Sequence, residues 1–129
     1  MATLPVYELS NLDGVRVSSP QAEGALVCFI KEDCPTCQEV MPVLDAFFAQ
    51  YGEHMPVQVI GQTQEGNSAL DAAFSPSFSI LDDSALQVSF AADIETVPTL
   101  LHTDANGNEL TRLVGFVKDE WQTMASELD

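Results

Sequence analysis

The feature that most constrains the fold is an apolar segment that runs almost directly into two cysteines and a helix. Residues 25–31 (ALVCFIK) are nearly all apolar, as is typical of a central strand buried on both faces. The sequence C-P-T-C follows at residues 34–37. Across residues 35–50 the apolar side chains recur at helical spacing, which predicts a helix that begins at the cysteines and is kinked at Pro42. A buried strand followed at once by a helix indicates an α/β fold.

The rest of the chain continues this alternation of strand-like and helix-like segments. Strands separated by helices predict right-handed parallel crossovers, whereas the last two strands are joined by a turn and must be antiparallel. We therefore expect one domain, residues 1–129, built on a mixed central β-sheet flanked by helices. Asn67 or Ser68 is expected to cap the second helix. The further strands are expected at 6–10, 15–18, 55–60, 78–81, 99–103 and 109–114, and the further helices at 67–74, 84–92 and 118–128.

Composition and charge exclude several classes of function. Asp and Glu number 20 against 4 Lys and Arg, for a formal net charge of −16, so binding to nucleic acid is not expected. No apolar run is long enough to span a bilayer, and the first residues lack the features of a signal peptide. We expect no membrane insertion and a cytoplasmic protein, or a periplasmic or other extracytoplasmic one if a signal or anchor has been removed. The acidic excess suits either a high-salt habitat or a basic partner surface.

The two cysteines are placed for chemistry. Cys34 is expected at the helix N-terminus, where free N–H groups and the helix dipole favour a thiolate. Cys37 lies about one turn further on, so the pair can attack a disulfide, form a mixed disulfide and resolve it internally. A zinc site would need two more ligands, and neither Cys28 nor the two histidines, His54 and His102, form a second paired spacing. We therefore expect no metal, and Cys28 is interpreted as an inert core residue.

These residues resemble the motifs of the thioredoxin superfamily, and the resemblance covers nearly the whole chain. The family has a C-x-x-C pair, a helix proline five residues after its second cysteine, here Pro42, and a later hydrophobic-Pro-Thr segment, here at residues 97–99. Gly115 matches the glycine that follows the last strand. An N-terminal hairpin and a helix–strand insertion at about 61–86 are most similar to the TlpA-like branch.

The resemblance implies a thiol-disulfide oxidoreductase that needs neither a metal nor an organic cofactor. Cys34 is the implied nucleophile, and the more buried Cys37 is the residue that resolves the mixed disulfide. The implied partners are protein thiols and disulfides and an electron donor or acceptor whose identity stays open, and we expect a monomer. The substrate groove is expected to comprise Pro35, Thr36, Thr96, Val97 and a cis Pro98.

The sequence departs from the family pattern close to the cysteines. Asp33, preceded by Glu32, stands where thioredoxins have tryptophan, and Cys28 stands where they have a buried acid. Val40 stands where TlpA-like proteins have an active-site glutamate. The two acids oppose formation of a thiolate at Cys34, whereas the helix N-terminus favours it. The alternative hypothesis is therefore a thioredoxin-fold binding or adaptor module with a vestigial or regulatory disulfide.

Overall fold

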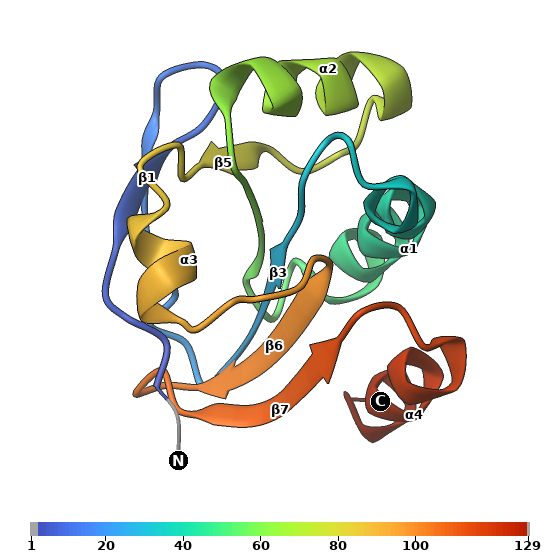
Figure 1. Cartoon of the computed structure of the whole chain (residues 1–129). Coiled ribbons are helices and arrows are strands. Elements are labelled where there is room, and N and C mark those ends of the chain that lie inside the picture. The colour runs from blue at the N-terminus through green and yellow to red at the C-terminus, as the bar shows by residue number, and fades with distance from the viewer. Residues whose placement is uncertain (1–2, 129) are drawn as a thin grey trace.

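A mixed β-sheet forms the centre of the computed structural model, which describes residues 3–128 (Figure 1). Within these residues the sheet has seven strands in the order β2-β1-β5-β4-β3-β6-β7. Strands β3, β4 and β5 run parallel, while β6 and β7 pair antiparallel at one side and β1 and β2 at the other. The α/β class and the mixed sheet predicted from the sequence are confirmed.

The helices and strands lie close to the expected segments. The strands are β1 (Glu8–Ser10), β2 (Arg16–Ser18), β3 (Gly24–Phe29), β4 (Val57–Gly61), β5 (Ile80–Asp82), β6 (Thr99–Asp104) and β7 (Glu109–Val114). The helices are α1 (Pro35–Tyr51), α2 (Gln64–Phe74), α3 (Gln87–Ala91) and α4 (Lys118–Leu128). Among residues 3–128, no helix combines the length and the apolar character that crossing a membrane requires.

Strand β3 separates two hydrophobic cores, one on each face of the sheet. Its side chains alternate: Leu26 and Cys28 pack into the core beneath α1 and α4, while Val27 and Phe29 pack into the core on the side of α3. Figure 1 shows α1 and α4 on one side of the sheet and α3 on the other. Because both faces are covered, every residue from Ala25 to Phe29 is at most 1% exposed.

Helix α2 begins earlier than the sequence predicted. Thr63 is its N-cap, and the hydroxyl oxygen of Thr63 accepts a hydrogen bond from the N–H of Gly66 at 2.9 Å. The expected cap at Asn67 or Ser68 is wrong. Asn67 lies inside the helix, is only 2% exposed, and donates from its side-chain amide to the carbonyl oxygen of Leu81 at 3.0 Å. Asn67, a residue type that often caps helices, thus links α2 to β5 through its side chain.

Helix α3 is shorter than the expected segment 84–92. The buried carboxylate of Asp83 accepts hydrogen bonds from the backbone N–H groups of Val88, at 3.2 Å, and Ser89, at 2.9 Å. Leu86, just before the helix, has a positive φ of 58°. The chain therefore turns between Asp83 and Leu86 before the helix starts, so residues 84–86 are not helical.

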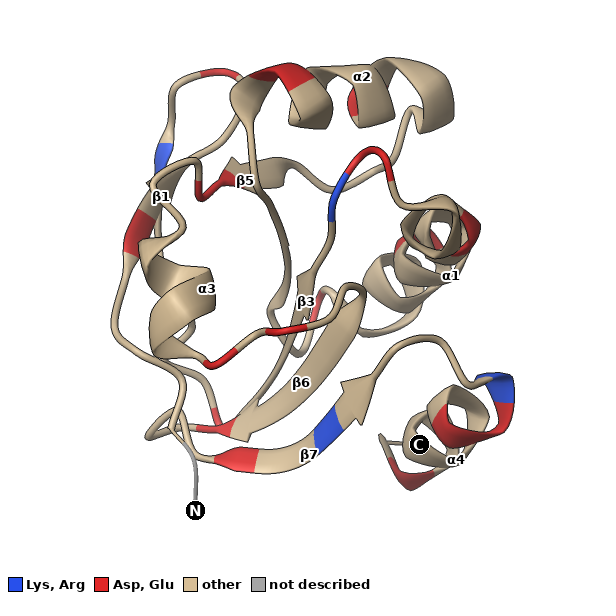
Figure 2. Cartoon of the chain, viewed as in Figure 1, with Lys and Arg blue, Asp and Glu red and all other residues tan. Residues whose placement is uncertain are grey.

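Acidic residues are distributed over loops, strands and helices around the molecule (Figure 2). Three of the four basic residues lie against a nearby acid in the described chain. These ion pairs are Arg16–Glu8 at 2.9 Å, Lys31–Asp33 at 3.5 Å and Arg112–Glu109 at 2.7 Å. The excess of negative charge is therefore spread over the surface and is not gathered on one element.

Candidate active site

Cys34 is the N-cap residue of α1. Its backbone is extended, with φ −101° and ψ 112°, and its sulfur accepts a hydrogen bond from the N–H of Cys37 at 3.2 Å. Pro35, which follows, needs no hydrogen-bond acceptor for its nitrogen and suits the first helical position. The half-buried Cys34 sulfur therefore lies where unpaired N–H groups and the helix dipole stabilise negative charge.

Cys37 lies one turn inside the helix and is fully buried. Its sulfur accepts a hydrogen bond from the N–H of Lys31 at 3.4 Å, which joins the loop after β3 to the first turn of α1. Burial, followed by its hydrogen bond with Cys34, raises the pKa of Cys37 to about 12. At neutral pH, Cys37 is therefore a protonated thiol beneath the more accessible Cys34.

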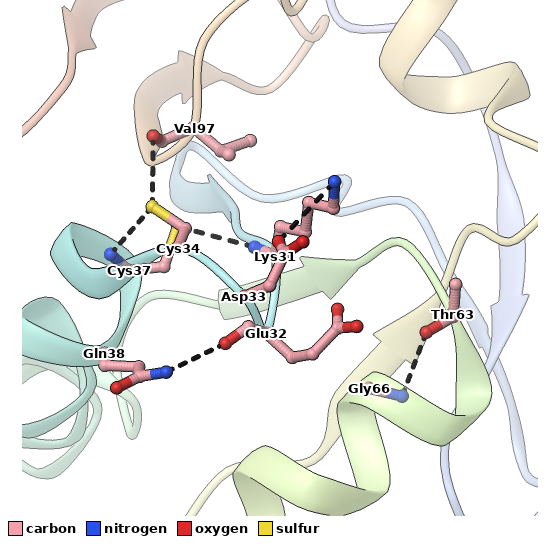
Figure 3. A network of polar contacts seen from close by, with 9 residues as sticks. All are labelled: Lys31, Glu32, Asp33, Cys34, Cys37, Gln38, Thr63, Gly66 and Val97. Atoms are coloured by element: carbon pink, nitrogen blue, oxygen red, sulfur yellow. Dashed lines mark hydrogen bonds and ion pairs between the residues drawn. The ribbon is translucent and has the colours of Figure 1, made fainter.

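The segment before β6, the strand that pairs with β3, brings Val97 next to Cys34 (Figure 3). The Cys34 thiol donates to the carbonyl oxygen of Val97 at a sulfur–oxygen distance of 3.6 Å. The Val97–Pro98 peptide bond is cis, and Pro98 is buried. The N–H of Gly115 donates to the Pro98 carbonyl oxygen at 2.7 Å, so the turn after β7 supports this segment from behind.

The five expected groove residues differ in their exposure. Pro35 and Thr96 are exposed, Thr36 and Val97 are half-buried, and Pro98 is buried. The carbonyl oxygen of Thr96 accepts a hydrogen bond from the hydroxyl of Thr99 at 2.6 Å, which orients the exposed segment next to β6. Cys34 and Val97, 63 residues apart in the sequence, are thus brought into direct contact.

No protein-family model matches the sequence, and no curated protein matches it. Solved structures do resemble it. A Chlorobium tepidum protein proposed to be the thiol:disulfide interchange protein DsbE superposes with a TM-score of 0.87 at 18% identity, covering 98% of this chain and 93% of that one. The thioredoxin domain of a thiol-disulfide oxidoreductase from Bacteroides vulgatus has a TM-score of 0.82 at 15% identity, covering 99% and 96%. This chain has a thioredoxin fold.

A third neighbour of this thioredoxin fold is a secreted disulfide oxidoreductase of Mycobacterium tuberculosis, described as homologous to DsbE of E. coli. Its TM-score is 0.75 at 18% identity, and the match covers 94% of this chain and 95% of that chain. The three neighbours have thiol-disulfide chemistry in their names, and each is similar to this chain over nearly its full length.

Cys28 stands at the thioredoxin position of a buried acid and packs in the same core as Cys37. Burial, and in second place the nearby Cys37, raise the pKa of Cys28 well above its usual range. Cys28 is therefore a neutral thiol at neutral pH. Of the two histidines, His54 is exposed beyond the end of α1, while burial lowers the pKa of His102 on β6.

Metal binding finds no support in the described part of the chain. Within residues 3–128, no group of three or more His, Cys, Asp or Glu side chains is arranged to hold a metal ion.

The sequence did not show how the two acids before Cys34 are arranged. Asp33 forms an ion pair with Lys31, with 3.5 Å between the Asp33 carboxylate oxygen and the Lys31 amino nitrogen. Glu32 extends in a different direction, toward the first turn of α2 and Gly66 (Figure 3). Nothing in the sequence indicated this approach, because the helix was expected to begin at Asn67, after Gly66.

Proposed function

We propose that this chain is a thiol-disulfide oxidoreductase of the TlpA-like type that reduces or exchanges disulfides in protein substrates. We propose that residues 1–129 form a single domain for this task, with Cys34 and Cys37 as its redox pair. The observation that carries the proposal is the position of the Cys34 sulfur. It lies 3.2 Å from the Cys37 nitrogen at a helix N-terminus and 3.6 Å from the Val97 carbonyl oxygen.

In the reducing direction, the Cys34 thiolate attacks one sulfur of a substrate disulfide. The substrate S–S bond breaks, a mixed disulfide forms with Cys34, and the first substrate thiolate leaves and takes up a proton. Cys37 then loses its proton and attacks the Cys34 sulfur, which releases the second substrate thiol and forms the Cys34–Cys37 disulfide. Two electrons pass to the substrate, together with one proton from Cys37 and one from solvent, and a thiol donor must reduce the pair again; oxidation of a substrate dithiol is the reverse sequence.

The raised pKa of Cys37 suits this order of events. A thiol whose pKa is about 12 remains protonated at neutral pH, so the free enzyme presents one reactive sulfur, that of Cys34. Cys37 becomes a nucleophile only when a base accepts its proton. The leaving substrate thiolate can be that base, because neither Cys28 nor Val40 supplies a carboxylate at the family positions.

The groove is proposed to bind substrate through backbone groups. Thr96 is exposed and Val97 is half-buried. Both residues lie just before β6, whose pairing with β3 and β7 begins at Thr99. An extended substrate segment can therefore align its backbone beside residues 96–97 while its disulfide reaches Cys34. Pro35, Thr36 and Pro98 are proposed to form the remaining walls of this groove, with no cofactor or metal.

We further propose that the protein acts as a monomer outside the cytoplasm. The extracytoplasmic alternative is favoured over the cytoplasmic one because the similar M. tuberculosis protein is described as secreted. Fractionation of cells of the source organism, with an antibody that detects the endogenous protein, tests this location. Recovery in the cytoplasmic fraction alone would contradict it.

Reduction of insulin disulfides with dithiothreitol as the donor tests the activity. The wild-type protein should accelerate insulin precipitation, and Cys34→Ser should remove the acceleration, whereas Cys28→Ala should retain most of it. Equilibration with glutathione then gives the redox direction, since about −270 mV is typical of a reductant and about −120 mV of an oxidant. A wild-type protein that forms no Cys34–Cys37 disulfide and leaves insulin unchanged would favour the binding-module alternative.

A further inference from the structure

Two carboxylates next to a reactive thiolate would normally make that thiolate less stable, because like charges repel. Here Glu32 and Asp33 immediately precede Cys34. The side chain of Asp33 is 64% exposed and lies 3.5 Å from the Lys31 amino group, so its charge is partly offset and in contact with solvent. Glu32 is half-buried, and within residues 3–128 no lysine or arginine forms an ion pair with it.

Glu32 lies between two helices, with its backbone bonded to α1 and its side chain directed toward α2. Its carbonyl oxygen accepts a hydrogen bond from the side-chain amide of Gln38 on α1 at 3.0 Å. Its carboxylate extends the other way, toward α2, while the Cys34 sulfur turns toward Val97 (Figure 3). The Glu32 carboxylate and the Cys34 sulfur thus point in different directions.

Gly66 makes this placement possible. A Cβ atom at position 66 would lie 2.4 Å from Glu32 Oε2 and 2.5 Å from Glu32 Cδ, closer than real Cβ contacts allow. Gly66 lies in the first turn of α2, where its N–H donates to the Thr63 hydroxyl oxygen. Glycine disfavours helix, and its presence here fits a position that both the Glu32 carboxylate and the Thr63 hydroxyl oxygen, 2.8 Å from the same Cβ, approach closely. The N-terminal turn of a helix also carries partial positive charge, which stabilises a carboxylate.

We propose that the absence of a side chain at Gly66 lets the Glu32 carboxylate lie at the first turn of α2. This placement keeps the negative charge of Glu32 away from the Cys34 sulfur. Helix α2 thereby becomes part of the electrostatic environment of the redox pair although it contributes no residue to it. The inference deepens the proposed function and rests on it for its consequence, the reactivity of Cys34. The other titratable or charged groups near this arrangement are Lys31 and Asp33 on the same loop, Cys37 on α1, and Glu65 on α2.

The decisive experiment moves the carboxylate without removing it. Gly66→Ala places a methyl group where the carboxylate lies, and Glu32→Asp shortens the side chain so that it no longer reaches α2. In both variants we expect Cys34 alkylation by iodoacetamide at pH 7 to slow about threefold and its pH profile to move to higher pH. Glu32→Gln, which has the same shape without charge, should react at least as fast as the wild type.

A combined variant separates charge from structure. If the displaced carboxylate causes the effect, Glu32→Gln in the Gly66→Ala background should restore the wild-type alkylation rate. The matched control is Glu65→Gln in the same background, because Glu65 is an exposed acid of the same helical turn and its removal should restore nothing. In the glutathione equilibrium, a threefold shift toward the disulfide in Gly66→Ala corresponds to a potential about 14 mV more negative.

Two results would overturn the proposed placement of the Glu32 charge. Alkylation profiles of Gly66→Ala and Glu32→Asp that match the wild type would show that the placement of this charge has no effect on Cys34. Slower alkylation that Glu32→Gln fails to restore would assign the effect of Gly66→Ala to distortion of α2. The alkylation measurement needs no substrate, so it tests this placement even if insulin reduction fails; failure of insulin reduction with an intact variant pattern would contradict only the proposed function.

Discussion

At the scale of single residues, burial distinguishes the three thiols. Cys34 is half-buried at the helix tip, whereas Cys28 and Cys37 are at most 1% exposed. After mild reduction, limiting iodoacetamide should therefore label Cys34 at least about tenfold faster than either other cysteine. Mass spectrometry of the digested protein measures this ratio. Preferential labelling of Cys37 or Cys28 would contradict the assignment of the nucleophile.

The raised pKa of Cys37 also predicts how stability depends on pH. Burial raises this pKa from its usual value of 9.0 to about 12, so between these values the unfolded chain loses the proton that the folded protein keeps. The contribution to stability is fully present below pH 9 and is lost as the pH rises toward 12, at up to about 1.4 kcal/mol per pH unit. Urea unfolding at pH 8 and pH 10 measures the loss.

The disulfide form is the control for this pH dependence. Tyr7, whose pKa burial also raises, is present in both redox forms, and the burial that is the main cause of the raised Cys28 pKa is the same in both. The Cys34–Cys37 disulfide leaves no thiol to ionise at position 37. The reduced protein should therefore lose more stability between pH 8 and pH 10 than the oxidised protein, and an equal loss in both forms would contradict the raised pKa.

At the scale of elements, the start of α3 depends on one buried carboxylate. Asp83 is 2% exposed and accepts hydrogen bonds from two backbone N–H groups and from the Ser89 hydroxyl, the last at 2.7 Å. Asp83→Ala leaves these buried donors unpaired and should lower the free energy of unfolding by about 2 kcal/mol.

Asp82→Ala is the matched control for Asp83→Ala. Asp82 is the neighbouring acid, and its hydrogen bonds, to the N–H and hydroxyl of Ser84, are exposed. Its removal should cost less than about 1 kcal/mol. Denaturant unfolding compares the two variants, and equal losses would show that Asp83 does not stabilise the turn into α3.

At the scale of the whole molecule, charge repulsion is the dominant electrostatic feature. The net charge is −16, its acidic residues lie on loops, strands and helices along the chain (Figure 2), and the Debye length falls from about 30 Å at 0.01 M salt to about 3 Å at 1 M. The melting temperature should therefore rise with sodium chloride at neutral pH, by more than for a near-neutral protein of the same fold.

Carboxylate protonation provides the control for the salt effect. Near the sequence pI of about 4.1 the net charge approaches zero, so the dependence of the melting temperature on salt should shrink. Because the repulsion is a sum over many pairs, no single Asp or Glu substitution should remove it. A flat melting temperature across the salt range at pH 7 would contradict the idea that surface repulsion destabilises the folded protein.

Much of the secondary structure and the core of the site could be read from local patterns. Helix α4 spans the predicted residues 118–128 and strand β7 the predicted residues 109–114, because apolar periodicity and turn residues act over a few neighbouring positions. The C-P-T-C sequence after an apolar strand placed Cys34 at the helix tip for the same reason. The roles of polar side chains that can either cap a helix or bond across the fold were predicted less well. Asn67 was expected to cap α2, but its side chain joins α2 to β5.

Local sequence patterns were enough to predict the order of strands and helices, the burial of β3 and the spacing that lets two cysteines share one helical turn. The surroundings of these cysteines depend on contacts between segments that are far apart in the chain. The Val97 carbonyl oxygen reaches Cys34 because β6 pairs with β3, and the Glu32 carboxylate reaches Gly66 because α2 packs beside the loop. The physical reason is one of range: backbone hydrogen bonding and periodicity act between near neighbours in the chain, whereas the reactivity of a thiol depends on every charge and dipole that folding brings close to it.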